Sequence, residues 1–359
     1  MSDPAFCLSV DRASAFMSAV LYQLGAPPDA ATTTVDQLLE ASLTGYDAHG
    51  IMRIPAYVSC IQKGSFIPAA RPEIVKETPA SALIDAHCGL GPVATRLALE
   101  LAGEKARTVG IGCVSIIGAN DIACLGSYLW RPARAGLIAL LMVNDAGGGP
   151  AAVPWGSTQA FLSTNPLAAG VPRSQGPPLV IDISTSVSSF GQVRMRANQN
   201  QDVPTDWLID AEGQFTQDPH SLTGPRRTSA LMPLGGTSAG HKGFGLSLLV
   251  DIMAGALSGA GCSTGVENDL YRNGVFALAL DPEAFVGLGS FADQVEAFVA
   301  GLKQVRPAPG IDRIVLPGER ADTLRRQRRQ TGIPVDVPTR HALVQILDKL
   351  DLPDEYGLS

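Results

Sequence analysis

Hydrophobic positions near both ends of the chain follow a helical period. Apolar residues recur three and four positions apart, as on the buried face of an amphipathic helix. This spacing predicts helices within residues 9–44, with a break at Pro27-Pro28, and a further helix over 53–61. The segment 319–350 is predicted to form charged helices. Both ends of the chain are therefore expected to be mainly helical.

The middle of the chain has a different pattern, in which short apolar runs alternate with helical stretches. The runs predict strands at 81–85, 111–117, 136–143, 179–183 and 274–280, and the stretches predict helices at 92–109, 125–135 and 242–259. Strands that are apolar on both faces belong in a sheet covered by helices. The pattern favours an α/β fold, and 359 residues allow two domains or one large domain with an insertion.

Composition excludes several classes of protein. Hydrophobic residues make up 45% and charged residues 17% of the chain, which is too apolar for intrinsic disorder. The net charge of −7 disfavours a nucleic-acid partner, which would call for a basic stripe. The one basic run, Arg325-Arg326-Gln327-Arg328-Arg329, is interpreted as a solvated helical face.

The sequence also predicts a cytoplasmic protein without a membrane partner. We find no signal peptide, and the longest apolar stretch, 246–257, contains Asp251 and is shorter than the roughly 20 residues that span a bilayer. The six cysteines are scattered without C-x-x-C spacing. They indicate buried thiols rather than a disulfide framework, and no metal site is expected.

No common cofactor or nucleophile motif is present. The nearest match to the dinucleotide-binding G-x-G-x-x-G is Gly147-Gly148-Gly149-Pro150, where the proline and the missing later glycine spoil the pattern. Candidate chemistry therefore rests on single polar residues near the ends of predicted elements.

His49 and Arg53, four residues apart after a predicted helix, are the first candidates. A histidine can move a proton near neutral pH, and an arginine can bind a carboxylate through two parallel hydrogen bonds. Together they suit the reduction of a 2-oxo acid. The more common interpretation of this spacing is a loop histidine beside a surface arginine.

Two further positions are open to two interpretations each. Asp182 lies in the apolar run 179–183, where burying a carboxylate is costly unless it has a partner. Its side chain is interpreted either as orienting a histidine or as capping the next turn. The segment 240–245 opens an apolar helix, whose N–H groups together with Lys242 suit a phosphate, or else its glycines form a tight entry turn.

Taken in order, segments through nearly the whole chain resemble the malate/L-lactate dehydrogenase superfamily. This superfamily also contains sulfolactate, ureidoglycolate and diketogulonate dehydrogenases and the cyclic ketimine reductases. The matching stretches are His49–Tyr57, Gly110–Gly112, Ser163–Leu167, Ile181–Ser186, Pro204–Trp207 with Asp210 and Gly213, Pro233–Gly236, His241–Leu246 and Pro317–Arg320.

The resemblance implies a fold unlike the Rossmann domain and an intertwined homodimer. A mainly helical domain, built from 1–75 with 309–359, would carry His49 and Arg53. An α/β domain over 76–308 would bind the nicotinamide cofactor. The missing G-x-G-x-x-G is then expected.

The resemblance also implies roles for individual residues. His49 would be the proton donor, Arg53 would bind the substrate carboxylate, and Asp182 would belong to the relay that positions the histidine. The cofactor would be contacted by Thr164, Asn165, Pro166, His241, Lys242, Gly243, Gly318, Glu319 and Arg320.

The chain departs from the family pattern at two positions. Ala48 stands where the family usually has serine, and Asp121 stands where many members have a second histidine of the catalytic site. An ionised aspartate only accepts hydrogen bonds. It would repel an anionic substrate and favour a cationic one, such as a protonated imine.

The resemblance therefore predicts an NAD(P)-dependent dehydrogenase that transfers a hydride to or from C2 of a small 2-oxo or 2-hydroxy acid. One alternative is reduction of a cyclic ketimine or another imino acid, and another is a non-catalytic dinucleotide-binding relative. The choice between NAD and NADP stays open. A cation near the ribose 2′-phosphate would select NADP, and Arg173, Arg194 and Arg196 are candidates.

Overall fold

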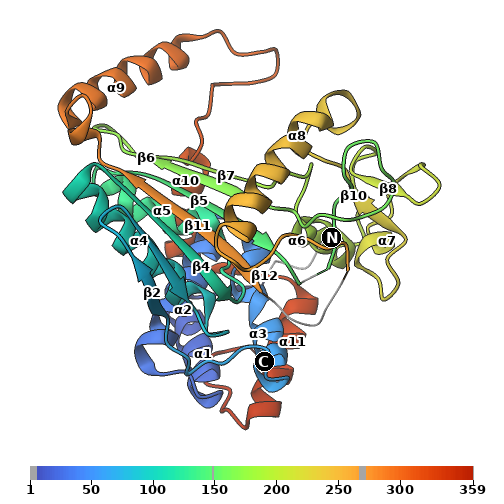
Figure 1. Ribbon diagram of the computed structural model, residues 1–359. Coiled ribbons are helices and arrows are strands. Elements are labelled where there is room, and N and C mark those ends of the chain that lie inside the picture. The colour runs from blue at the N-terminus through green and yellow to red at the C-terminus, as the bar shows by residue number, and fades with distance from the viewer. Residues whose placement is uncertain (1–5, 148, 267–271, 359) are drawn as a thin grey trace.

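The computed structural model describes residues 6–147, 149–266 and 272–358. Helices from both ends of the chain pack together beside a central sheet (Figure 1). From the N-terminal end come α1 (Val10–Gln23), α2 (Pro28–Leu43), the two 3₁₀ helices η1 (Asp47–His49) and η2 (Ile51–Arg53), and α3 (Ile54–Gln62). From the C-terminal end come α10 (Glu319–Thr331) and α11 (Val337–Leu350).

This helical part has its own apolar core. Phe16, Leu38, Tyr57 and Leu343 are fully buried in it, so that all of α1, α2, α3 and α11 contribute. Two short strands, β1 (Phe6–Leu8) and β12 (Ile333–Val335), pair antiparallel and join the two ends. The helices predicted within 9–44, 53–61 and 319–350 are confirmed, with the first broken at Leu24–Pro27.

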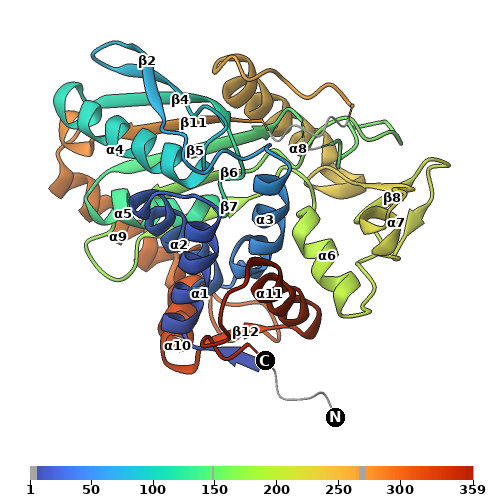
Figure 2. The ribbon, with the colours of Figure 1, turned by 90° about the horizontal axis from the view of Figure 1, so that it is seen from below.

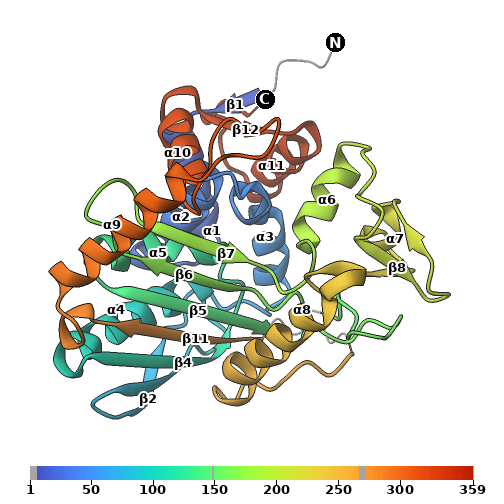
Figure 3. The same cartoon turned by 90° about the horizontal axis from the view of Figure 1, so that it is seen from above.

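The central sheet has seven strands in the order β2-β3-β4-β11-β5-β6-β7 (Figures 2 and 3). The strands are β2 (Glu73–Glu77), β3 (Ser81–Asp85), β4 (Ile111–Ala119), β5 (Ile138–Asp145), β6 (Leu167–Val171), β7 (Leu179–Ile183) and β11 (Asn273–Leu280). Only β3 and β4 pair in parallel among the described strands. All five predicted strands are confirmed to within two residues.

Helices cover the sheet on both faces, as the apolar strands require. Figures 2 and 3, which view the molecule from opposite sides, show α4 (Gly91–Val109) and α5 (Leu125–Arg134) on one face and α8 (Gly236–Val250) on the other. The π-helix η3 (Asp251–Ala256) continues α8 and packs on β5 and β11. The predicted helix 242–259 is therefore wrong in its limits, because it starts earlier and its last turns are wider.

Several elements were not predicted from the sequence. A small sheet of β8 (Leu208–Asp210), β9 (Phe215–Thr216) and β10 (Ser229–Leu231) packs with α6 (Phe190–Asn198) and α7 (His220–Thr223) around a separate apolar core. The 3₁₀ helix η4 (Pro282–Ala284) and the long helix α9 (Leu288–Gln304) follow β11. None of the helices that the structure describes is both long and apolar enough to cross a membrane.

The basic run of α10 is only partly a solvated face. Arg325 is 12% exposed and pairs with Glu40 and Asp322, while Arg328 is 13% exposed and pairs with Asp47. The prediction was wrong for these two arginines because they form ion pairs with carboxylates on α2, on η1 and on α10 itself.

Candidate functional site

The loop that carries His49 and Arg53 is packed tightly against α2. Gly50 joins the two 3₁₀ helices, and a Cβ at this position would lie 2.0 Å from the Ser42 Oγ. The same hydroxyl accepts a hydrogen bond from the Ile51 N–H at 3.0 Å. Only glycine fits here, and the close contact holds both functional side chains on one short, fixed segment.

Helix α10 holds the same loop from the C-terminal side of the chain. Arg328 donates from Nη1 to the Asp47 carboxylate at 2.5 Å and from Nη2 at 3.1 Å. It also donates to the Ser42 carbonyl. This fork of hydrogen bonds fixes η1 two residues before His49. Sequence analysis missed both Asp47 and Arg328, because nothing in the sequence brings together residues 281 positions apart.

Arg53 lies against Asp121, directly after β4. The Arg53 Nη2 donates to the Asp121 Oδ2, and the two side chains are 23% and 15% exposed. Asp121 Oδ1 accepts from the Ala123 N–H at 2.9 Å and from the Tyr57 hydroxyl at 3.2 Å. The residue expected to bind a carboxylate thus already contacts one from its own chain. Tyr57, on α3, is a member of this cluster that sequence analysis missed.

Asp182, on β7, lies at the N-terminal end of α5. Its Oδ2 accepts a hydrogen bond from the Gly126 N–H at 2.7 Å and lies 3.2 Å from the Cys124 Sγ, which donates to it. Burial raises the pKa of Asp182, and these two donors together with His49 act in the opposite direction. Asp182 therefore caps the start of α5 rather than the predicted turn that follows β7, and it also interacts electrostatically with the histidine.

His49 is partly buried, and its ring makes no hydrogen bond within the described residues. Burial and the Arg53 charge lower its pKa from the ordinary value of 6.5, while Asp121 and Asp182 act to raise it. At neutral pH the ring is therefore mainly neutral and able to accept a proton. Ala48, beside it, packs against α6, where a Cβ on Gly191 would come within 2.6 Å of the alanine methyl.

The segment 164–166 joins the small sheet region to β6 and is held by its backbone. Thr185 donates to the Thr164 carbonyl from both N and Oγ1 at 3.0 Å, and the Pro166 carbonyl accepts from the Val143 N–H at 3.1 Å. Asn165 is fully buried with φ +35°, and its Nδ2 donates to Ser247. Its Oδ1 is buried without a hydrogen-bond partner in the described structure. A polar ligand arriving here would find an unused acceptor.

The segment 241–243 follows a break in α8. Ala239 has non-helical angles (φ −137°, ψ 15°), so that a second helical segment begins beside His241 and Lys242. The His241 ring contacts Trp155 edge-on, and Lys242 is exposed, with no salt bridge among the described residues. Gly243 is buried. A Cβ at this position would lie 2.3 Å from the Leu234 carbonyl oxygen, so that a larger residue does not fit. The predicted cation, Lys242, is therefore exposed just after a break in α8, although the helix itself begins earlier than predicted, at Gly236.

The segment 318–320 opens α10. Gly318 has φ +95°, and a Cβ on it would meet the Pro178 carbonyl oxygen at 2.8 Å. The Glu319 carboxylate is engaged by Lys303 at 2.6 Å and by the Leu316 N–H at 3.0 Å. Arg320 is exposed and lies close enough to Tyr46 to lower that residue's pKa, against a larger increase from burial. Of these three, Arg320 is the side chain placed to meet an anion.

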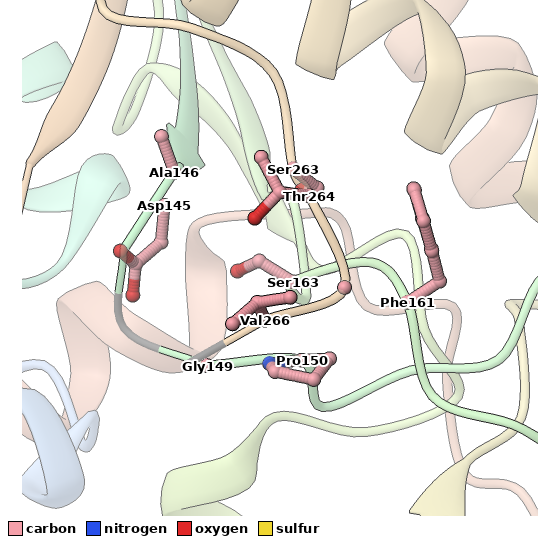
Figure 4. A pocket seen from close by; sticks show the side chains of 10 residues that line it. Asp145, Ala146, Gly149, Pro150, Phe161, Ser163, Ser263, Thr264 and Val266 are labelled. Atoms are coloured by element: carbon pink, nitrogen blue, oxygen red, sulfur yellow. The ribbon is translucent and has the colours of Figure 1, made fainter. Parts of the chain in front are cut away.

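A small pocket that is open to solvent lies at the C-terminal end of β5 (Figure 4). Asp145, Gly149, Phe161, Ser163 and Thr264 are among its lining residues, so it adjoins the segment 164–166. Two segments noted in the sequence line it, the glycine run at 147–149 and the start of Ser163–Leu167; Gly148 lies outside the described residues.

The three arginines suggested for a 2′-phosphate are engaged within the protein. Arg173 pairs with Glu296 at 2.9 Å and is only 8% exposed. Arg194 stacks on Phe190 and Arg196 on Trp207. No group of three or more metal-binding side chains is found among the described residues.

Comparisons with known proteins identify the family. The profile of the family described as Malate/L-lactate dehydrogenase matches residues 8–344. The chain belongs to this family. Malate dehydrogenase from Pyrococcus abyssi is 34% identical to it over 331 residues, covering 90% of each chain. The malate/L-lactate dehydrogenase family consists of NAD(P)-dependent oxidoreductases, and this chain is one of them.

Solved structures agree with that assignment. The crystal structure of malate dehydrogenase from Entamoeba histolytica superposes with a TM-score of 0.93 at 29% identity, covering 98% of this chain and 100% of that one. A Δ1-piperideine-2-carboxylate reductase from Pseudomonas syringae gives 0.82 at 29% identity, covering 95% and 99%. The non-Rossmann α/β fold expected from the resemblance is confirmed. The names of these relatives refer to a hydroxy acid in some cases and to an imino acid in others.

Proposed function

We propose that this enzyme interconverts a small 2-oxo acid and the corresponding 2-hydroxy acid, with the reaction centred on His49 and Arg53. One observation carries the proposal. A histidine and an arginine lie four residues apart on a segment fixed from α2 and α10, and Asp121 and Asp182 act electrostatically on the same histidine. A proton-transfer group, a carboxylate-binding group and an orienting carboxylate are thereby combined in one place.

Each residue has a distinct role in this proposal. Arg53 binds the substrate carboxylate, since the five N–H donors of a guanidinium form a fork that matches a carboxylate. His49 removes the hydroxyl proton when a 2-hydroxy acid is oxidised and returns it in the reverse direction. Asp182 stabilises the protonated ring. We propose that the helical part, 1–75 with 309–359, supplies the reacting side chains to a cofactor held by 76–308.

The residues present fit a nicotinamide dinucleotide. Its amide and phosphate groups suit the unused Asn165 Oδ1, the turn of α8 that follows the break at Ala239, and the exposed cations Lys242 and Arg320. Thr164, Pro166, Gly243 and Gly318 would shape the surface by their backbone, and Glu319 would act through its N–H rather than its engaged carboxylate. When bound, the cofactor supplies or accepts the hydride.

A thermal-shift titration with NADH and NADPH in parallel tests cofactor binding without any assumption about the substrate. A ligand that binds only the native state raises the melting temperature according to its affinity and excess. We expect one of the two cofactors to stabilise the protein clearly, and turnover of that cofactor with a panel of 2-oxo acids. Stabilisation without turnover of any 2-oxo or imino acid would contradict the proposed reaction.

A second candidate reaction is reduction of an imino acid, and the lowered pKa of His49 favours it. Reduction of a carbonyl needs a proton on oxygen, which a neutral ring does not provide. A protonated C=N group already carries its proton, so that hydride addition to carbon gives the amine directly. An Asp121→His variant that gains activity on simple 2-oxo acids and loses it on imines would support this candidate, and an unchanged profile would contradict it.

We also propose that the enzyme is a homodimer. Large apolar side chains are exposed on α8, η3 and α9 and in the turn before α9, among them Leu249 (47%), Ile252 (54%), Leu257 (58%), Phe298 (64%) and Phe285 (67%). Large apolar side chains exposed to solvent on several helices are typical of a contact between copies of a chain. Light scattering should give the mass of a dimer, and an Ile252→Glu/Leu257→Glu variant should give a monomer; a wild-type monomer would contradict the proposal.

A further inference from the structure

Asp121 brings a fixed negative charge into contact with the arginine proposed to bind the substrate. Its Oδ2 contacts Arg53, and its Oδ1 accepts from the Ala123 N–H at 2.9 Å and the Tyr57 hydroxyl at 3.2 Å. The Tyr57 hydroxyl also lies 3.1 Å from the Asp121 carbonyl oxygen, and Tyr57 is fully buried. Both carboxylate oxygens are therefore held in one position.

This carboxylate stays ionised at neutral pH. Burial acts to raise its pKa, but the Arg53 charge, the Ala123 N–H, His49 and Tyr57 together lower the pKa of Asp121 below its ordinary value of 3.8. Burial also raises the pKa of Tyr57 well above 10, so the hydroxyl remains a donor. Asp121 thus neither gives nor takes a proton during turnover and acts as a permanent anion.

The charges around His49 are unbalanced toward the negative. The charged groups that act on its ring are one cation, Arg53, and two carboxylates, Asp121 and Asp182. A further cation, Arg320, acts to lower the pKa of Tyr46. The proposed function assigns Arg320 to the cofactor. Two carboxylates and one guanidinium therefore act on His49.

The consequence depends on the charge of the substrate. A single carboxylate can share the guanidinium with Asp121. A second carboxylate on the same small substrate would lie within a few ångströms of Asp121 and be repelled. An uncharged side chain meets no such repulsion, and a protonated nitrogen is attracted.

We propose that Asp121, Arg53 and Tyr57 form a charge filter that excludes dicarboxylates and admits monocarboxylates whose remaining part is neutral or carries a protonated nitrogen. The charge filter rests on the proposed function, because it assumes that the substrate carboxylate binds Arg53. It separates this chain from the relatives whose names specify malate, a dicarboxylate.

Steady-state kinetics with oxaloacetate and 2-oxobutanoate test the charge filter, since oxaloacetate carries a second carboxylate where 2-oxobutanoate ends in an uncharged methyl group. We expect wild type to prefer 2-oxobutanoate in kcat/KM by about tenfold or more, and Asp121→Asn to reduce that preference by about tenfold. Tyr57→Phe should reduce it less. Asp29→Asn is the matched control, because it removes an exposed Asp–Arg ion pair elsewhere, with Arg71, and should leave the ratio unchanged.

Binding of oxamate and oxalate gives a readout that does not need turnover. These analogues are nearly isosteric and differ by one charge, and their binding to the enzyme–cofactor complex can be followed by thermal shift. We expect oxamate to bind wild type more tightly than oxalate, with the difference reduced in Asp121→Asn.

The two proposals fail in different ways. A wild-type preference for oxaloacetate and oxalate, or a ratio unaffected by Asp121→Asn, would overturn the charge filter alone. If neither analogue binds and no substrate of any charge is turned over, the proposed function itself is overturned.

Discussion

The segment that carries His49 and Arg53 differs from the segments proposed to bind the cofactor in how far the protein itself satisfies its polar groups. Around Arg53 and the loop before it, Ser42, Arg328 and Asp121 make hydrogen bonds and ion pairs within the chain. On the cofactor side, Lys242 and Arg320 are exposed, and the Asn165 Oδ1 lacks a partner in the described structure.

The difference indicates that the two regions contribute to the reaction in different ways. Groups that must meet the reacting atoms in one geometry are fixed before any ligand arrives, since misplacement by about 1 Å can cost two orders of magnitude in rate. Groups proposed to bind phosphates and an amide have no such partners within the described structure. Substitutions around His49 and Arg53 should therefore change kcat. Substitutions in the segments proposed to bind the cofactor should change the Kd of the cofactor.

The largest of three effects that sharpen this comparison is expected from Arg328→Ala. The variant leaves the mostly buried Asp47 carboxylate and the Ser42 carbonyl without their donor, which should cost about 2 kcal/mol of unfolding free energy. Because η1 loses its anchor, kcat should fall by about tenfold or more, with little change in cofactor affinity. Denaturant unfolding and steady-state kinetics measure the two effects. Arg329→Ala, an exposed neighbour, is the control; equal losses in both variants would refute the anchoring role.

A smaller effect, on affinity alone, is expected from Lys242→Ala. Removing an exposed cation at a phosphate site should raise the Kd of the preferred cofactor about tenfold, equivalent to about 1.4 kcal/mol, and leave kcat at saturating cofactor unchanged. Fluorescence titration of the reduced cofactor gives Kd. Lys63→Ala, also exposed and on the turn after α3, should have no effect. A fall in kcat without a change in Kd would contradict this role, because it would indicate that Lys242 acts in the reaction, as proposed for the segment that carries His49 and Arg53.

The smallest effect is a difference between pH profiles. The pKa of His49 lies below 6.5, so the neutral ring that accepts a proton persists as the pH falls through 6.5. Oxidation of a 2-hydroxy acid should therefore retain its kcat down to that pH and decline only below it, whereas reduction of a 2-oxo acid should increase as the pH falls. An oxidation rate that already declines above pH 6.5 would contradict the lowered pKa.

The sequence predicted most of the long elements, because each has an apolar face with a clear period. It did not predict β6, whose Leu-Ala-Ala-Gly-Val lacks the large side chains that mark a strand, or β8 to β10, which are too short to have a period. Helix α9 was missed although it is 17 residues long, and its apolar residues, such as Phe298, lie on the surface of the single chain.

Prediction of the site was limited in a different way. Single residues such as His49, Arg53 and Asp182 were recognised by their chemistry and by the family pattern. The residues that support the site were not. Tyr57, Cys124 and Arg328 are ordinary residues that acquire a role only through tertiary contact, with Asp121, Asp182 and Asp47 respectively. The sequence predicts that Asp121 attracts cations but does not show that Arg53 lies beside it; in the structure Arg53 is the cation that Asp121 contacts.

The most direct test of the account compares wild type with His49→Ala in the turnover of the preferred cofactor with its best substrate. If His49 transfers the proton, kcat should fall by roughly 10²–10⁴-fold while cofactor binding, measured by thermal shift, stays the same. A variant that binds cofactor normally and turns over at a rate close to wild type would contradict the central claim that the reaction is centred on His49.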